Sequence, residues 1–245
     1  RTSLAWHHDV SIYFTFNDSV NGIYESQVID VCRFFSDNLN TPTSLVASFP
    51  RKLMDGERKK LQAGWPNAQI HSSRIPLRFF RFNRYFLKKY FTKNDKGVVI
   101  ARGVLATRIA LDLREQGYLH KVIYDGRGAV HAEFEEYIQP GTSFSQKMKA
   151  FEEQAVNLSD SRIAVSNALV QHWREKYKYT SDNHVVIPTT LSTTAQRDLP
   201  EEKNRIKGRA KLGLSVADVL FVFSGGDAAW QSASLLKYFI ERHFS

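Results

Sequence analysis

Cysteine is almost absent from this chain of 245 residues, in which Cys32 is the single thiol. One thiol excludes an internal disulfide and fits the reducing cytoplasm. Long apolar runs are missing too, because no uncharged stretch approaches the roughly 18 residues that a membrane-spanning helix requires. The chain starts with RTSLAWHHDV, which lacks the apolar segment of a secretory signal. Together these absences predict a cytoplasmic protein.

Acidic residues are scarce relative to basic ones, since 25 Asp and Glu stand against 34 Lys and Arg, which gives a net charge of +9. This excess favours polyanions, anionic lipid or phosphorylated ligands, without choosing among them. RNA-recognition, KH and helix-turn-helix patterns are missing, so no nucleic-acid partner is expected. Walker loops, G-x-S-x-G elbows and His or Cys clusters with metal spacing are missing as well. We therefore expect no metal ion and no bound cofactor.

Apolar runs typical of strands alternate with helical patterns along most of the chain. Strands are expected at Val10 to Phe16, Ser44 to Phe49, Gln69 to Ser72, Val98 to Ala101, Val122 to Tyr124, Arg162 to Val165 and Val185 to Ile187. Helices are expected near residues 23–35, 78–92, 103–116, 143–158 and 167–177. Strands separated by helices form βαβ units. The pattern therefore predicts an α/β fold, with a Rossmann-like parallel sheet and helices on both of its faces.

The most informative series of residues runs RIAVSNALVQHWREKY, then HVVIPTTLS, then RAKLGLSVADVLFVFSGG. Its order is strand, capped helix, strand, connector and a new strand at Val219 to Phe223. The series resembles the junction between the two domains of glycosyltransferase family 4 enzymes, which have the GT-B architecture. The matching residues are Val165-Ser166, Val186-Ile187-Pro188, Arg209 to Leu214 and Phe221 to Gly226. An unrelated doubly wound α/β protein is the alternative interpretation.

The resemblance implies three segments. Residues 1–190 would form the N-terminal, acceptor-side Rossmann-like domain, residues 191–217 a charged connector, and residues 218–245 the first βα unit of a truncated, donor-binding C-terminal domain, which includes a helix at 232–243. Members of the family carry a pair of Glu residues late in that second domain, beyond the end of this chain. The chain as given is therefore expected to be inactive by itself.

The donor side of the resemblance is confined to one loop. Gly225 and Gly226 follow the expected strand, and their backbone N–H groups suit the approach of a diphosphate. The family usually places Arg and Lys shortly afterwards, whereas this chain continues DAAWQSAS. An ordinary strand-to-helix turn that uses glycine for close packing is the alternative.

Loops at the carboxyl ends of the strands are the expected acceptor side, because ligands of open α/β sheets lie there. The candidate catalytic residues are Asp125 and Arg127, in a D-G-R-G sequence that resembles the "D.RG" loop of bacterial family members. A structural Asp–Arg pair that braces the loop is the alternative. The substrate-binding candidates are Asn21, Gly22, Arg102, Gly103, Gly126 and Gly128. Arg102 and Arg127 would share one anion site if their strands are neighbours, and Asn21 and Gly22 have a simple helix cap as their alternative.

Residues 74–91 carry a second kind of signal, because Arg74, Arg78, Arg81, Arg84, Lys88 and Lys89 would fall on one arc of a helix with Phe and Tyr on the other. Such a helix fits an anionic membrane surface, and a helix that covers the sheet with a solvated basic face is the alternative.

These observations favour one function. The resemblance implies a hexosyltransferase-type glycosyltransferase, which moves a sugar from a nucleotide-sugar donor to a glycan or lipid-linked acceptor in bacterial surface-polysaccharide or glycolipid biosynthesis. Its place would be the cytoplasm or, as a peripheral protein, the inner face of the cell membrane. A non-catalytic α/β assembly domain and a basic nucleic-acid-binding module are the alternatives.

Overall fold

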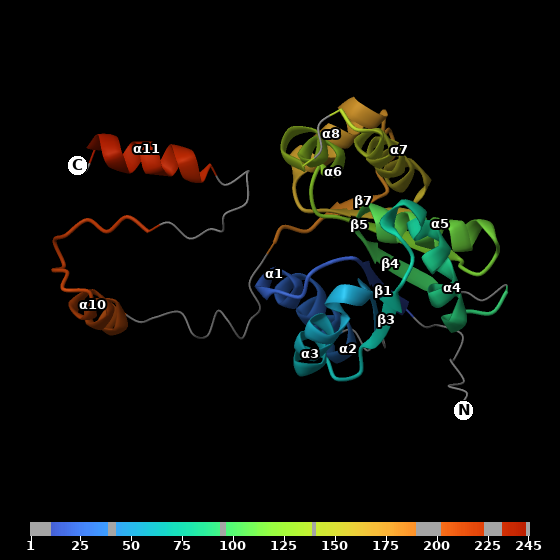
Figure 1. The fold of residues 1–245 in the computed structure, drawn as a ribbon, viewed down its shortest axis with the longest axis horizontal. Helices are drawn as coiled ribbons and strands as arrows, with labels where there is room; N and C mark the ends of the chain where they lie inside the picture. The colour runs from blue at the N-terminus through green and yellow to red at the C-terminus, as the bar shows by residue number, and fades with distance from the viewer. Residues whose placement is uncertain are drawn as a thin grey trace. The chain divides into compact units, whose positions relative to one another are not determined.

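The computed structural model of the protein describes residues 11–38, 43–93, 97–138, 141–189, 202–222 and 232–243. The chain divides into two compact units, residues 1–190 and residues 191–245. The first unit contains the parallel sheet, and the second contains helices α10 (Glu202–Lys211) and α11 (Ala233–His243) (Figure 1). A search of the described ranges finds no helix that is long and apolar enough to span a bilayer.

Seven parallel strands form the sheet of the first unit. They are β1 (Ser11–Phe16), β2 (Thr43–Pro50), β3 (Gln69–Ser73), β4 (Val98–Arg102), β5 (Lys121–Gly126), β6 (Ser161–Ala164) and β7 (His184–Val186). Their order is β3-β2-β1-β4-β5-β6-β7, so the chain builds outward from β1 on one side and then returns to build on the other. This is the order of a Rossmann-like sheet. The predicted α/β fold class is confirmed, and so are the seven strands predicted for these residues.

The residues of β1 alternate between the two faces of the sheet, as the two-residue period of a strand requires. Ile12, Phe14 and Phe16 pack into the apolar core on one face. Tyr13 packs into the core on the other face. Because both cores are filled by the same strand, β1 is an interior strand that is buried on both faces of the sheet.

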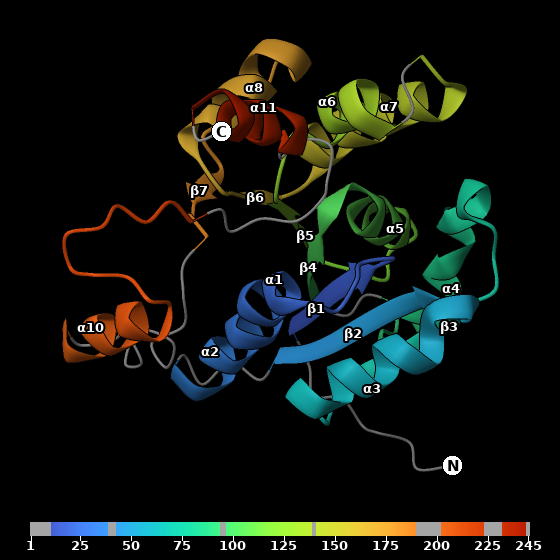
Figure 2. The same cartoon turned by 60° about the vertical axis from the view of Figure 1, so that its left-hand side comes forward.

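Helices cover both faces. The helices of the first unit are α1 (Gly22–Tyr24), α2 (Asp30–Asn38), α3 (Met54–Gly64), α4 (Arg84–Leu87), α5 (Gly103–Glu115), α6 (Val130–Glu133), α7 (Ser143–Leu158) and α8 (Asn167–Tyr177). Shorter turns are η1 (Glu25–Ile29) and η5 (Phe134–Ile138), which are π-helical, and η2 (Arg51–Leu53), η3 (Leu77–Asn83) and η4 (Lys88–Tyr90), which are 3₁₀-helical. Figures 1 and 2 show α6, α7 and α8 gathered at the β5 to β7 end of the sheet, with α2 and α3 beside β1 to β3.

Four of the predicted helices are confirmed. The helix expected at residues 23–35 runs from Gly22 to Asn38 with the π-helical turn η1 inside it, and the other three are α5, α7 and α8. Helix α3 was not predicted, because only Met54 and Leu61 give it an apolar face. Helix α6 was not predicted either, since it is four residues long.

The continuous helix predicted near residues 78–92 is wrong. The segment consists of η3, α4 and η4 in succession, and Phe79 inside η3 has non-helical dihedral angles (φ −114°, ψ 21°). The single basic arc derived from 100° per residue therefore does not exist. The physical reason is local, because the Asn83 side chain donates to the carbonyl of Phe80 at 2.7 Å and the N–H of Arg84 bonds only three residues back, to Arg81. A side chain thus competes with the hydrogen bonds of a regular helix.

The strand predicted at Val219 to Phe223 is also wrong over its described part. Residues 219–222 adopt no regular structure, and the side chains of Val219 and Val222 are largely exposed. A strand needs a neighbour to take up its backbone hydrogen bonds, and none is present among the described residues of this unit. The helix predicted after it is confirmed as α11, and the polar connector contains the exposed helix α10.

Candidate functional site

The candidate site lies at the carboxyl ends of β1, β4 and β5, which are adjacent in the sheet. The order of the strands reverses between β1 and β4, and the loops on either side of such a reversal leave the sheet in opposite directions. Three of the predicted loops meet here, namely the loop after β1 with Asn21, the turn at Arg102 and the D-G-R-G loop after β5. The topology therefore brings the N-terminal candidate residues to one edge.

Arg102 bridges the reversal point. Its Nε donates to Asp18 Oδ2 at 2.8 Å, in the loop after β1, and its Nη2 donates to the side-chain oxygen of Gln27 at 2.9 Å. Its Nη1 lies 3.8 Å from Asp125 Oδ2, at the end of β5. Only 9% of the Arg102 side chain is exposed. One guanidinium thus ties together the ends of all three strands.

Asp125 is the fully buried centre of the cluster. It accepts a hydrogen bond from the hydroxyl group of Tyr13, and Arg127 contacts it twice, with Nη2 at 2.9 Å from Oδ2 and Nε at 2.8 Å from Oδ1. Both guanidinium groups converge on this carboxylate, so Arg102 and Arg127 lie together, while their use as an anion site stays a prediction. These contacts form a bracing Asp–Arg pair, which was the alternative interpretation of this loop. Of the candidate pair, Arg127 retains access to solvent.

The charges of the cluster balance, since Asp18 and Asp125 offset Arg102 and Arg127. Burial raises the pKa of Tyr13 well above its usual value, and the nearby Asp125 carboxylate raises it further, so the phenol stays protonated and donates. Burial lowers the pKa of Arg102, but the nearby carboxylates of Asp18 and Asp125 and the hydrogen bond to Asp18 oppose it, and the net pKa is raised. The cluster is consequently a fixed brace at the edge of the sheet.

The loop after β1 is held by its backbone. Asn17 takes a left-handed conformation (φ 57°) and its N–H donates to the carbonyl of Ser48 at 2.9 Å. Asn21 caps the following helix, since its side-chain oxygen accepts from the N–H of Tyr24 at 3.0 Å. Asn21 therefore acts as the helix cap that was its alternative interpretation. At the next residue, Gly22, an added Cβ atom would meet nothing within 4 Å. Gly22 leaves an open stretch of backbone at the edge.

The π-helical turn η1 shapes the same edge. It widens the helix at Gln27, whose backbone carbonyl lies 3.3 Å from the Tyr13 hydroxyl and whose side-chain nitrogen donates to Thr189 at 3.1 Å. Single π-helical turns are often found at functional sites, because they turn side chains out of the regular spiral.

The three glycines of the other two loops differ in what they allow. Gly103 has a left-handed conformation (φ 76°) that bends the chain from β4 into α5. A Cβ atom at Gly126 would lie 2.6 Å from the Trp173 ring, so this glycine permits close packing. A Cβ atom at Gly128 would lie 2.4 Å from Glu133 Oε1, the end of a flexible side chain. Gly126 is therefore a packing residue, while Gly128 lies beneath a carboxylate at the rim.

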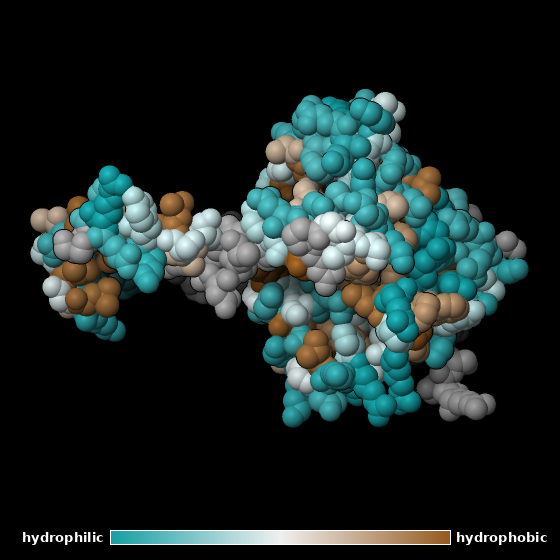
Figure 3. Space-filling view, turned by 45° about the horizontal axis from the view of Figure 1, so that its top comes forward, coloured by the Kyte–Doolittle hydropathy of each residue, from teal (hydrophilic) through white to brown (hydrophobic). Residues whose placement is uncertain are grey.

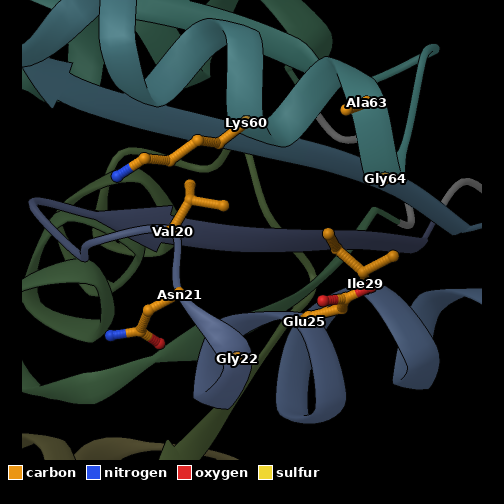
Figure 4. Close-up of a pocket in the computed structure, with 8 residues that line it drawn as sticks. All are labelled: Val20, Asn21, Gly22, Glu25, Ile29, Lys60, Ala63 and Gly64. Atoms are coloured by element: carbon orange, nitrogen blue, oxygen red, sulfur yellow. The ribbon is translucent and has the colours of Figure 1, made fainter.

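A depression of about 430 Å³ adjoins the loop after β1. Figure 4 shows Asn21, Glu25 and Ile29 reaching into it from the helix that follows β1, with Lys60 extending from α3. Lys60 is paired with the buried Glu57 at 3.1 Å, and Glu57 also accepts from the N–H of Val20 at 2.5 Å. The depression thus presents a hydrogen-bond donor, Lys60, and an acceptor, Glu25, next to Asn21 and Gly22.

Several residues of this edge were missed by sequence reasoning. Tyr13, Asp18 and Gln27 complete the cluster, yet each looked ordinary, as an aromatic strand residue, a loop residue and a helix residue. Of these residues, only Asp18 could have been recognised as a site candidate, because it lies two residues after the end of a predicted strand.

The donor-side candidates Gly225 and Gly226 lie outside the described residues. Within the described ranges, no group of three or more His, Cys, Asp and Glu residues is arranged to hold a metal ion.

Comparisons with known proteins find matches among solved structures. No protein-family model matches the chain, and no curated protein matches its sequence. Solved structures do match, among them the apo form of WaaB, described as a lipopolysaccharide outer core galactosyltransferase. That match has 15% sequence identity and a TM-score of 0.49, and it covers 78% of this chain and 50% of the other. The chain thus spans about half the length of that galactosyltransferase, and the Rossmann-like assignment rests on the strand order described above.

Proposed function

We propose that this chain belongs to a GT-B glycosyltransferase, in which residues 1–190 form the acceptor-side domain. The observation that carries the proposal is the convergence of Arg102 and Arg127 on Asp125, at the carboxyl edge where the strand order reverses. Ligands of open α/β sheets bind at such an edge. The junction motifs that resemble glycosyltransferase family 4 support the same assignment.

The proposed reaction is hexosyl transfer from a nucleotide-sugar donor to a glycan or lipid-linked acceptor. It belongs to bacterial surface-polysaccharide or glycolipid assembly, in the cytoplasm at the inner face of the cell membrane. The donor diphosphate would meet the backbone of Gly225 and Gly226. The nucleotide sugar is a substrate, so the proposal needs no cofactor.

The two candidate catalytic residues have different roles in this proposal. Asp125 is fully buried and contacts Tyr13 and Arg127, so it is a positioning residue that holds the guanidinium in place. Arg127 is the group that meets substrate oxygens. A fixed cation stabilises developing negative charge best when it needs no rearrangement, and a buried carboxylate provides that fixation. Asn21, Gly22, Arg102, Gly103, Gly126 and Gly128 line the same acceptor edge.

Transfer by the full-length protein tests the function. The purified protein is incubated with radiolabelled UDP-, GDP- and dTDP-sugars and with a lipid and polysaccharide extract, and incorporation of label is counted. Label should enter the extract from one class of donor. If no nucleotide sugar binds saturably and none is turned over, the chain is the alternative assembly domain. Saturable binding of an oligonucleotide in its place favours the alternative nucleic-acid-binding module.

A matched pair of variants tests the site. Arg127→Gln should lower kcat/KM at least tenfold and leave the melting temperature within a few degrees, because Arg127 has access to solvent. Arg174→Gln is the control, since Arg174 also pairs with an aspartate, Asp182 at 3.0 Å, but on α8. Equal losses of activity in the two variants would remove Arg127 from the site.

A further inference from the structure

One surface of the first unit has a composition that the sheet does not require. Residues 74–93 include seven Arg and Lys residues and no Asp or Glu. The same stretch exposes large apolar side chains to between 39% and 54%, namely Leu77, Phe79, Phe82 and Tyr85. These four residues, with Arg78, Arg84, Lys88 and Lys89, are called the aromatic-basic surface below. Figure 3 shows hydrophobic groups set among hydrophilic residues on the face of the molecule that it presents.

The broken backbone of this segment sorts its apolar residues into two sets. Phe80 and Leu87 are buried against the sheet with α5. Phe79, Phe82 and Tyr85 point away from that core, and each is about half exposed. The exposed set therefore contributes little to the stability of the fold.

Cations lie over the exposed rings. The guanidinium carbon of Arg78 is 4.9 Å from the ring centre of Phe79, and that of Arg84 is 5.0 Å from Tyr85 and 5.4 Å from Phe82. Lys88 extends the row to Tyr118, at 4.4 Å, in the loop that precedes β5. Each exposed ring is thus paired with a positive charge.

Most cations of residues 74–93 have no acidic partner within the part of the chain that the structure describes. Arg81 is the exception, since its Nε and Nη2 bind both oxygens of Asp112 at 2.8 and 2.6 Å. Among the described residues, Arg78, Arg84, Lys88 and Lys89 form no ion pair. Four free cations next to exposed aromatic rings therefore meet solvent with no acidic neighbour on their own segment.

We propose that the aromatic-basic surface docks on an anionic lipid bilayer. The four cations complement the lipid phosphates, while the half-exposed rings and Leu77 enter the region between headgroups and acyl chains, where amphipathic aromatic groups are favoured. The inference deepens the proposed location at the inner face of the membrane by naming the surface responsible.

The geometry favours lipid over single-stranded nucleic acid. Bases stack on open aromatic faces, whereas the rings of Phe79, Phe82 and Tyr85 are already approached by guanidinium groups of their own chain. A guanidinium that lies against a ring still presents its N–H edge to a phosphate. Such a pair buries its ring side in an interface and keeps its charge at the headgroups.

Vesicle co-sedimentation tests the proposal without any assay of sugar transfer. Full-length protein is spun with phosphatidylcholine vesicles that contain either no phosphatidylglycerol or 30% of it, at 50 mM and at 500 mM NaCl. The wild type should sediment with the anionic vesicles at 50 mM NaCl and only weakly with the neutral ones. If it does not sediment with anionic vesicles at 50 mM NaCl, the proposal is overturned, and sugar transfer can still occur.

Two variants locate the interaction. Replacing Arg78, Arg84, Lys88 and Lys89 with Gln should lower the partition coefficient at least fiftyfold, since each cation near an anionic surface contributes about fivefold. The control replaces Arg51, Lys52, Arg58 and Lys59 with Gln, which removes the same charge from exposed positions at and before α3. The control should bind almost as the wild type does. Equal loss in both variants would mean adsorption by net charge alone, which overturns the assigned surface.

A third variant tests insertion. Phe79→Ser, Phe82→Ser and Tyr85→Ser together should abolish the binding to anionic vesicles that remains at 500 mM NaCl, where charges are largely screened. Circular dichroism melting should show that each variant keeps its fold. Unchanged high-salt binding by this variant would contradict docking through the rings. A 20-nucleotide single strand that binds the wild type while vesicles do not would assign the surface to nucleic acid instead.

Discussion

The hydroxyl group of Tyr13 donates a hydrogen bond to the carboxylate of Asp125, which lies 112 residues further along the chain. Both side chains are buried, and they join the interior strand β1 to the end of β5. The contact fixes the carboxylate on which Arg102 and Arg127 converge. The candidate site is thus built from the core outward.

Removing this carboxylate should destabilise the protein more than removing the phenol. Asp125→Ala leaves two guanidinium groups without their shared partner, and breaking a buried pair in this way costs about 3–5 kcal/mol. Tyr13→Phe removes one hydrogen bond to the carboxylate and should cost about 1–3 kcal/mol of the free energy of unfolding. Urea titration followed by circular dichroism measures both. A smaller loss for Asp125→Ala than for Tyr13→Phe would show that the carboxylate does not anchor the cluster.

Two glycines in one loop should respond differently to the same change. Gly126→Ala places a methyl group 2.6 Å from the buried Trp173 ring, and such overpacking costs about 1–3 kcal/mol. Gly128→Ala meets only the end of the Glu133 side chain, which can rotate away, so its unfolding free energy should change by less than about 0.5 kcal/mol. Thermal melting of the two variants side by side decides this. A larger loss at Gly128 would mean that the Glu133 carboxylate is held in place.

Cys32 should be inert in the folded protein. It lies on α2 and is fully buried against the core, and burial raises the pKa of its thiol to about 12. Because the thiolate is the reactive form, a maleimide at pH 8 should label Cys32 only when the helix opens. Labelling followed by mass spectrometry should therefore speed up steeply in urea. Rapid labelling in the absence of denaturant would place the thiol at the surface.

Glu152 should make stability fall as pH rises. It is fully buried, where it accepts from the backbone N–H groups of Val130 and His131 and from the Tyr177 hydroxyl. Burial raises its pKa above the usual 4.5, against the opposing effect of those hydrogen bonds. The unfolded chain then loses this proton near pH 4.5 while the folded one retains it, so ionisation favours unfolding until the pH passes the folded pKa.

Glu152→Gln isolates this contribution, because the amide does not titrate. The free energy of unfolding of the wild type minus that of the variant should decrease from pH 4.5 upward and then level off. Urea titrations at half-unit steps up to pH 7.5 measure the difference. A difference that grows with pH would mean that the hydrogen bonds outweigh burial and depress the pKa of Glu152.

Most of the sheet could be predicted from the sequence, because apolar runs such as Val98 to Ala101 are local signals. The meeting of Arg102 and Arg127 followed from the neighbourhood of β4 and β5. The partners of those arginines did not, since Tyr13 and Gln27 reach the cluster through tertiary contacts that no local pattern encodes. The break at Phe79 was not predicted either, because the Asn83 side chain takes the Phe80 carbonyl that a regular helix would use. Val219 shows the converse, since a strand-like sequence without a neighbour does not form a strand.

The position of β1 also constrains how the protein is made. Ser11 pairs with Thr43 on one side and with Val98 on the other, so the first strand to be synthesised is completed only when β4 arrives. At roughly 5–20 residues per second, the ribosome leaves one edge of β1 open for several seconds. An unpaired edge rich in aromatic and β-branched residues is a template for wrong pairing. The nascent chain therefore passes through a stage at which a strand from the interior of the finished sheet still exposes an unpaired edge.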